Sequence, residues 1–303
     1  AGYTSPPPPP IPRNNRCRRV AVVGASRWCH MFPNWAAVPP PAPAPPEWGT
    51  MATGPAEACC TPPHASRLLH DCASIGDLGP VVTLLQLGAC VEARDGDGRA
   101  PLHAAASSGR AAFAVALVRL GASVGARDDE GRTPLHDAAF SGRTECVRAL
   151  AELGADVDVT DQDGRTPLHD AAELGRLQAV LALLDLGASL DPCNDDGMTP
   201  LHCAALGGKE RCVQALVQVG AQVDARASCG STPLHFAATA GDEGCVRALA
   251  AVGANVGARD QTGRTPLHYA AETGSSACMK ALVELGAAVY ARDHEGQTPL
   301  YIA

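Results

Sequence analysis

Six histidines recur in one short phrase, and they are the residues of this chain best suited to chemistry. They are His103, His136, His169, His202, His235 and His268, and each follows a leucine. An imidazole acts as a general base beside a nucleophile or carboxylate, or as a zinc ligand where several converge. Successive copies are 33 residues apart, and one packed helical unit displaces such a residue by about 10 Å. That separation is too wide for a shared metal, so we predict no catalytic, cofactor-binding or metal-binding residue here.

The cysteines follow the same period. The chain has 13 of them, and one repeat position holds Cys in four copies and Phe113 or Ala179 in others; the four are Cys146, Cys212, Cys245 and Cys278. A position that accepts Cys, Phe or Ala is a core position, because a free thiol packs as a small hydrophobic group. We therefore predict buried free thiols. They favour a reducing compartment and an intracellular location, in the cytoplasm or the nucleus.

Acidic residues between the helices look like fragments of a calcium loop, as in "DGDGR" from Asp95 and "DQDGR" from Asp161. No glutamate follows at the closing ligand position of such a loop. We predict instead that these aspartates cap loop turns. The sequence also lacks Gly-rich nucleotide loops and the G-x-S-x-G nucleophile motif. It therefore predicts a protein that is not an enzyme and needs no cofactor.

Charge is unevenly distributed along the chain. Residues 1–63 carry five Arg and two Glu, a balance of +3, whereas the whole chain carries -8, so the remainder carries -11. An acidic body disfavours binding to nucleic acid and to anionic membranes. No apolar run approaches the roughly 20 residues that span a bilayer. We expect a protein partner, no nucleic acid, no membrane contact and a monomeric chain.

The histidine phrase belongs to a repeat of constant length. Within one copy, Thr133 is the predicted N-cap hydroxyl, Pro134 occupies the first helical position, and Gly142 ends the helix. A second helix is predicted from near Thr144 to its cap at Gly154. Such a unit cannot bury its own apolar faces, so the copies must stack on one another. The Thr of "TPLH" recurs at Thr133, Thr166, Thr199, Thr232, Thr265 and Thr298, with Ala100 in the copy before.

The pattern "DxxGxTPLHxAAxxG", followed by an apolar second helix and "GAxV", resembles the ankyrin repeat. The resemblance implies an all-α ankyrin-repeat solenoid of helix-turn-helix units with hairpin-like loops over residues 64–303. It also implies that each histidine ties the Thr hydroxyl to the backbone of a neighbouring loop. The expected copies are 64–95, which is degenerate, then 96–128, 129–161, 162–194, 195–227, 228–260 and 261–293, and the truncated 294–303.

Both ends of the chain depart from this regular array. Residues 1–63 hold the tracts Pro6–Pro12 and Pro39–Pro46, which favour polyproline II without a core. We predict that this segment is disordered; the alternative is a ligand for proline-binding domains. The last copy lacks its second helix, and we expect the chain to be a piece of a longer protein.

Positions one, four and five after each histidine vary while the framework stays fixed. Helical spacing places them on one face, and in ankyrin-like stacks that face lines the concave side. The predicted partner contacts there are Asp137, Phe140, Asp170, Glu173, Leu174, Leu206, Phe236, Tyr269 and Glu272. The sequence leaves open whether the aromatic residues bind a partner or fill gaps between helices. A row of loop arginines, mostly followed by Asp, is predicted to be solvated and self-neutralising: Arg94, Arg127, Arg226, Arg259 and Arg292.

These patterns predict a non-catalytic protein–protein interaction scaffold or adaptor that binds a partner through the concave face of the array. The alternative is the recognition fragment of a larger protein. Ankyrin arrays accompany ubiquitin-ligase-adaptor, kinase, palmitoyl-transferase and channel segments, and an effector domain of this kind would lie beyond Ala303.

Overall fold

The computed structural model describes residues 63–303, and this part of the chain is helical without strands. The prediction of a disordered segment over 1–63 falls outside the described residues, apart from Pro63, where the first described helix begins. The chain divides into Ala1–Glu57 and Ala58–Ala303, and the second unit is described here. Its helices are α2 (Pro63–Ile75), α3 (Val81–Gln86), α4 (Pro101–Ser108), α5 (Ala111–Arg119), α6 (Pro134–Phe140), α7 (Thr144–Glu152), α8 (Pro167–Glu173), α9 (Leu177–Asp185), α10 (Pro200–Leu206), α11 (Glu210–Gln218), α12 (Pro233–Ala240), α13 (Glu243–Ala251), α14 (Pro266–Glu272), α15 (Ser276–Glu284) and α16 (Pro299–Ile302).

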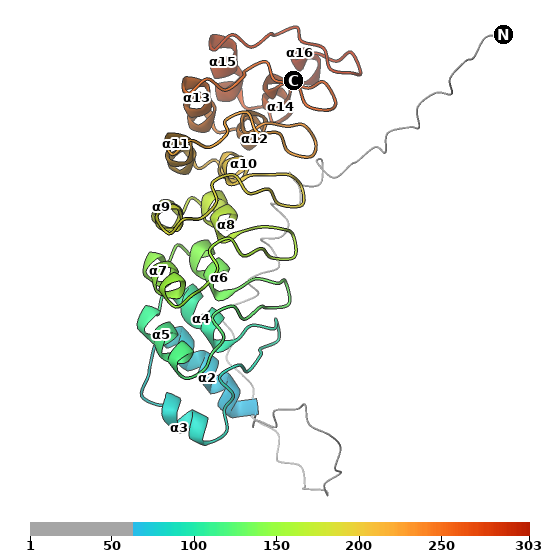
Figure 1. Ribbon diagram of the computed structural model, residues 1–303. Coiled ribbons are helices and arrows are strands. Elements are labelled where there is room, and N and C mark those ends of the chain that lie inside the picture. The colour runs from blue at the N-terminus through green and yellow to red at the C-terminus, as the bar shows by residue number, and fades with distance from the viewer. Residues whose placement is uncertain (1–62) are drawn as a thin grey trace, which may run out of the picture. The chain divides into compact units, whose positions relative to one another are not determined.

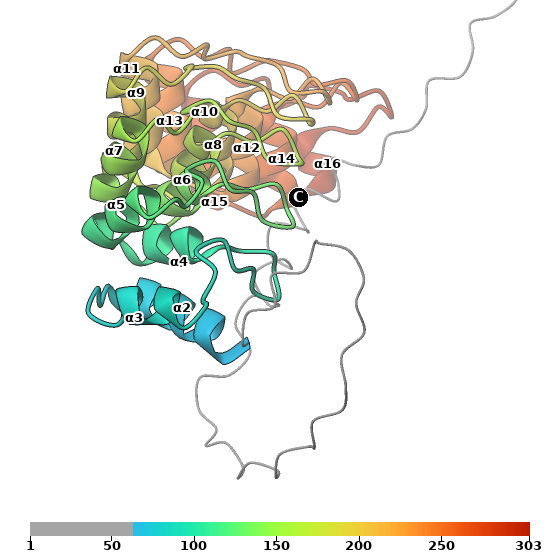
Figure 2. The ribbon, with the colours of Figure 1, turned by 60° about the horizontal axis from the view of Figure 1, so that its bottom comes forward.

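The helices form two layers, as the stacking argument predicts (Figure 1). The first-helix layer contains α2, α4, α6, α8, α10, α12, α14 and α16, and the second-helix layer contains the helices between them. From α6 to α13, each helix packs on its partner within the repeat and on the equivalent helices of the repeats on either side. The long loops between repeats extend from the side of the first helices and form a third layer (Figures 1 and 2). The all-α helix-turn-helix solenoid is therefore confirmed.

One core runs through the whole array, because every repeat contributes the same apolar positions to it. In the copy around α6 and α7 these include Leu135, Ala138, Cys146 and Leu150, all with no exposed surface. The predicted cysteine position is confirmed as a core position. Burial raises the pKa of the Cys146 and Cys212 thiols to about 11, since an apolar environment disfavours the thiolate.

We predict that thiol labelling will separate these cysteines by burial. In native protein without reductant, the exposed Cys193 should react quickly, and Cys146, Cys212, Cys245 and Cys278 should react slowly, because only the thiolate attacks the reagent. After denaturation all four should titrate as free thiols. A disulfide found among them by mass spectrometry would contradict both the burial argument and the reducing compartment.

The two ends of the array are built from incomplete repeats. Helix α3 has 6 residues where α5 has 9, because Gly79 and Pro80 occupy the positions that form the first turn of the other second helices. Helix α16 has only 4 residues. Apolar side chains are consequently exposed at the last repeat: Leu300 and Tyr301 are exposed, whereas their counterparts Leu267 and His268 are buried.

Amide hydrogen exchange should be faster in residues 276–303 than in the interior repeats. Helix α15 packs on one second-layer neighbour, α13, whereas α9 and α11 pack on two, and the stability of a stacked repeat depends on its neighbour interfaces. Peptides covering α8–α11 are the internal reference. Equal protection in α15 and α9 would contradict the claim that α15 is less stable because it has one second-layer neighbour instead of two.

Candidate functional site

The repeated histidines join each first helix to the loop of the next repeat. In every copy from His103 to His268, Nδ1 accepts the backbone N–H of the residue three positions earlier, at 3.0–3.1 Å. Nε2 lies 2.9–3.3 Å from a backbone oxygen 29 residues further on. Because a carbonyl only accepts, Nε2 must donate, and the ring is the neutral Nε2–H tautomer. The expected link between histidine and neighbouring loop is confirmed.

The threonine hydroxyl contacts the histidine ring, as the resemblance implies, and this contact takes the place of the simple N-cap bond that local rules predict. Thr133 is the N-cap residue of α6, but its side chain makes no capping hydrogen bond; Oγ1 lies 3.0 Å from Nδ1 of His136. The histidine ring satisfies the N-cap backbone instead. Thr298 shows the contrast: Tyr301 replaces the histidine, and there the hydroxyl accepts the N–H of Tyr301 at 3.3 Å.

Sequence reasoning missed a seventh member of this series. Nε2 of His70, in α2, lies 2.9 Å from the carbonyl oxygen of Arg99, which is again 29 residues away. The signal was the leucine before the histidine in "RLLHD", although Arg67 and Leu68 replace the Thr-Pro pair. The link therefore extends to the degenerate first copy. Among residues 63–303, no three His, Cys, Asp or Glu side chains gather closely enough to hold a metal ion.

The loop aspartates cap turns, as predicted. Oδ1 of Asp128 accepts the N–H groups of Glu130 and Arg132, and Asp161 and Asp293 repeat this pattern. The amide oxygen of Asn194 does the same for Asp196 and Met198. Each loop tip also donates one backbone N–H to the preceding loop, for example from Gln162 to the Glu130 oxygen at 3.1 Å.

The loop arginines are not the self-neutralising row that the sequence suggested. Nη1 of Arg127 donates to the backbone oxygen of Gly131 in its own loop and to that of Thr160 in the next. Arg94, Arg226 and Arg259 form the same pair of bonds. Unsatisfied loop carbonyls attract these guanidinium groups more effectively than the following aspartate does, since that carboxylate is already occupied by backbone N–H groups. The row links loops and offers little to a partner.

Two of the predicted contact residues, Asp137 and Asp170, are buried inside the array. Their exposed fractions are 1% and 6%. Asp137 is bound by the guanidinium groups of Arg132 and of Arg99 from the preceding repeat, and Oδ1 of Asp170 accepts from Arg165 at 2.9 Å. These carboxylates therefore do not form the open acidic patch that we inferred from helical spacing.

A sequence signal for these ion pairs was present. Arg and Asp stand five residues apart in "RTPLHD", and both change together in "MTPLHC", where Met198 and the buried Cys203 replace them. A charged pair replaced by an apolar pair indicates a buried contact between the two positions.

The aromatic residues Phe236 and Tyr269 are half-buried and pack on the histidines of the preceding repeat. Ring centroids are 5.5 Å apart for His202 and Phe236, and 5.7 Å for His235 and Tyr269, both edge to face. The Tyr269 hydroxyl donates to Asp260 at 2.7 Å, and burial together with this carboxylate raises the pKa of Tyr269. This packing favours the gap-filling alternative, with one ring edge left at the surface.

The other predicted contacts lie near the C-terminal ends of the first helices. Phe140, Leu174 and Leu206 are half-buried there, and Arg132 lies over the Phe140 ring at 5.4 Å. Glu173 pairs with Arg165, and the exposed Glu272 pairs with Arg264 at 2.8 Å. All five therefore lie at or directly after the C-terminal ends of first helices, with part of their surface accessible.

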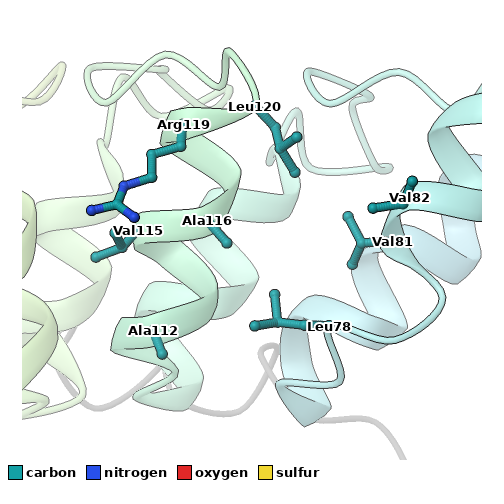
Figure 3. A pocket seen from close by; sticks show the side chains of 8 residues that line it. All are labelled: Leu78, Val81, Val82, Ala112, Val115, Ala116, Arg119 and Leu120. Carbon is teal, nitrogen blue, oxygen red and sulfur yellow. The ribbon is translucent and has the colours of Figure 1, made fainter.

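An apolar groove lies on the opposite side, in the second-helix layer. It has a volume of about 440 Å³ and is bounded by Leu78 before α3, Val82 in α3, Ala116 in α5 and Leu120 directly after α5 (Figure 3). The missing first turn of α3 creates it. Arg119 is the charged residue at its edge.

Comparison with known proteins identifies the fold family. A model described as "Ankyrin repeats (3 copies)" matches residues 69–161, 168–260 and 234–303. The chain belongs to the ankyrin-repeat family. The crystal structure of the human ASB11 ankyrin repeat domain is similar to this chain, with 31% identity and a TM-score of 0.65 over 72% of this chain and 96% of that one.

The ankyrin fold is common among solved structures, and the chain has no match among curated protein sequences. Matching solved chains number 595, so the ankyrin fold by itself selects no particular partner. In residues 63–303 of this ankyrin array, no helix is long and apolar enough to cross a bilayer.

His169→Ala should reduce the free energy of unfolding by roughly 1–3 kcal/mol at pH 7, because it leaves buried backbone groups of two repeats without partners. His294 is exposed and provides the matched control, since His294→Ala should change stability by no more than about 0.5 kcal/mol. Urea unfolding measures both. Equal effects of the two substitutions would contradict the linking role.

Stability should also fall as the pH is lowered from 6.5 towards 4. Burial lowers the pKa of His169 and His202 to about 4, whereas the unfolded value is about 6.5. Between these values the unfolded chain binds more protons, so each such histidine removes on the order of 3 kcal/mol as the pH falls through this window. The deficit of His169→Gln relative to the wild type should shrink across the same range. A deficit independent of pH would refute the neutral buried ring.

Proposed function

We propose that this chain is a non-catalytic scaffold or adaptor that binds a partner protein through its first-helix layer and loop tips. Ankyrin repeats are generally protein–protein interaction modules. The histidines, which were the best candidates for chemistry, have both ring nitrogens occupied within the array: in His169, Nδ1 binds the N-cap backbone of its own repeat and Nε2 binds the loop of the next. Binding is therefore the activity that the described residues support best.

The observation that supports this proposal is a set of side chains that remain partly accessible after the repeats have packed on one another. Phe140, Leu174 and Leu206 remain half-buried on three consecutive repeats, and Glu272 remains exposed two repeats further on. Apolar groups that are partly accessible at the centre of a surface are typical of binding hot spots. Phe236 and Tyr269 belong to the proposed surface through their exposed edges, whereas Asp137 and Asp170 support it from beneath. We also propose that the protein is monomeric and intracellular, and that its repeats have the bounds expected from the sequence.

The second candidate is that the chain is the recognition part of a larger protein. The similar human ASB11 chain is itself described as an ankyrin repeat domain, which favours this alternative. Both candidates use the same surface, and they differ only in whether an effector segment of kinase, channel, transferase or ligase-adaptor type accompanies the array.

Leu174→Asp and Leu206→Asp should each weaken binding of an identified partner by about 2 kcal/mol or more, because they place a charge in the proposed apolar centre. The partner is identified by cross-linking and mass spectrometry, and its dissociation constant is then measured by calorimetry. Val219→Asp is the matched control, since Val219 is exposed in the second-helix layer. Asp170→Lys is unsuitable as a probe because it breaks a buried ion pair.

If Val219→Asp weakens binding and both leucine variants bind normally, the partner uses the second-helix layer and the proposed surface is wrong. Circular dichroism and urea unfolding of each variant distinguish lost contacts from lost folding.

A further inference from the structure

Four cations occupy one position in four consecutive repeats, at the turn between first and second helix. They are Arg110, Arg143, Arg176 and Lys209. The same position holds Asp77 in the repeat before and Asp242 in the repeat after. The basic row is thus confined to the first part of an otherwise acidic array, with a negative residue at each end.

Each cation is held in place by the repeat that precedes it. Nε of Arg143 donates to the Ser107 oxygen at 3.1 Å, and Nε of Arg176 donates to the Phe140 oxygen at 3.1 Å. The aliphatic part of the side chain lies over a glycine in the left-handed region: Gly142 has φ 70°, and a Cβ there would lie 2.8 Å from Cδ of Arg176. Gly175 and Lys209 repeat this contact. Anchored side chains lose less entropy on binding than free ones.

The anchoring leaves the terminal nitrogens available. Arg110, Arg143 and Arg176 are exposed, and within residues 63–303 none of the four cations has a carboxylate within ion-pair distance. Exposed Glu145 and Glu210 lie in the first turns of α7 and α11, close to the row in sequence; Glu210 accepts from Gln214. With Nε occupied, the two Nη groups form a fork that fits one carboxylate.

We propose that this basic row binds an extended acidic segment of a protein partner, with one carboxylate for each repeat. This inference deepens the proposed function and rests on it. Neighbouring repeats are about 10 Å apart, and an extended peptide advances about 3.3 Å per residue, so acidic residues at every third position match the row. Phe140, Leu174 and Leu206 lie near the same helix ends, which favours apolar residues between the acids. The net charge of -8 disfavours a continuous polyanion.

The test uses fluorescence anisotropy with the whole chain and a labelled peptide that has Glu at every third position and Leu between. A second peptide of the same composition has its Glu residues contiguous, and a single-stranded oligonucleotide is the third probe.

Arg143→Gln with Arg176→Gln should raise the dissociation constant for the first peptide by about fivefold or more, from the loss of two exposed ion pairs. Arg119→Gln with Lys280→Gln makes the same charge change in the second-helix layer and should have little effect.

Arg143→Lys with Arg176→Lys keeps the charges but removes the two forks, so it should weaken binding less than the Gln pair does; Lys209 already contributes charge without a fork. Binding should weaken as salt increases. The inference fails if the periodic peptide does not bind, if the contiguous peptide binds equally, if both Gln pairs lose affinity equally, or if the oligonucleotide binds more tightly.

The proposed function can fail separately. A partner whose affinity depends on Leu174 and Leu206 but not on Arg143 and Arg176 would preserve the function and refute the basic row. If the peptide binds through the basic row but no partner binds through Leu174 and Leu206, the basic row is supported and the proposed function is refuted.

Discussion

No repeat of this array can fold alone, because each buries its apolar residues against its neighbours. Leu135 and Ala138 of one first helix have no exposed surface only because α4 and α8 lie on either side of α6. Stability therefore resides in the interfaces. The constant length of 33 residues follows from the same requirement, since an insertion within a repeat would shift these positions out of contact.

The histidine links add a polar component to each apolar interface. A helix N-terminus and a loop carbonyl both need partners where water is excluded, and one neutral imidazole satisfies a group on each repeat. The same geometry occupies the ring: an imidazole that accepts at Nδ1 and donates at Nε2 within the array has no free nitrogen for a substrate. A residue type that is typical of active sites serves here to align structural units.

Periodic features were predictable from the sequence, whereas contacts between repeats were harder to predict. Helix starts such as Pro134, the core position of Cys146 and the turn-capping role of Asp128 follow from local rules, and the structure agrees. Burial of Asp137 was missed because helical spacing gives its direction but not the guanidinium of Arg99, which arrives from another repeat. The anchoring of Arg176 on Phe140 was missed for the same reason, since the two residues are 36 positions apart.

The arginines that link neighbouring loops also make the loop layer stiffer at the two ends of the array than in its middle. Arg94 and Arg127 connect the first loops, and Arg226 and Arg259 connect the last ones, but Thr160 and Cys193 have no guanidinium at the corresponding positions. Across those two interfaces the loop tips keep a backbone bond, such as that from Asp195 to the Asp163 oxygen, but lack the guanidinium bonds. Bending of the loop layer is therefore easiest in the middle of the array, so that its two halves can adjust to each other while each half keeps its own shape.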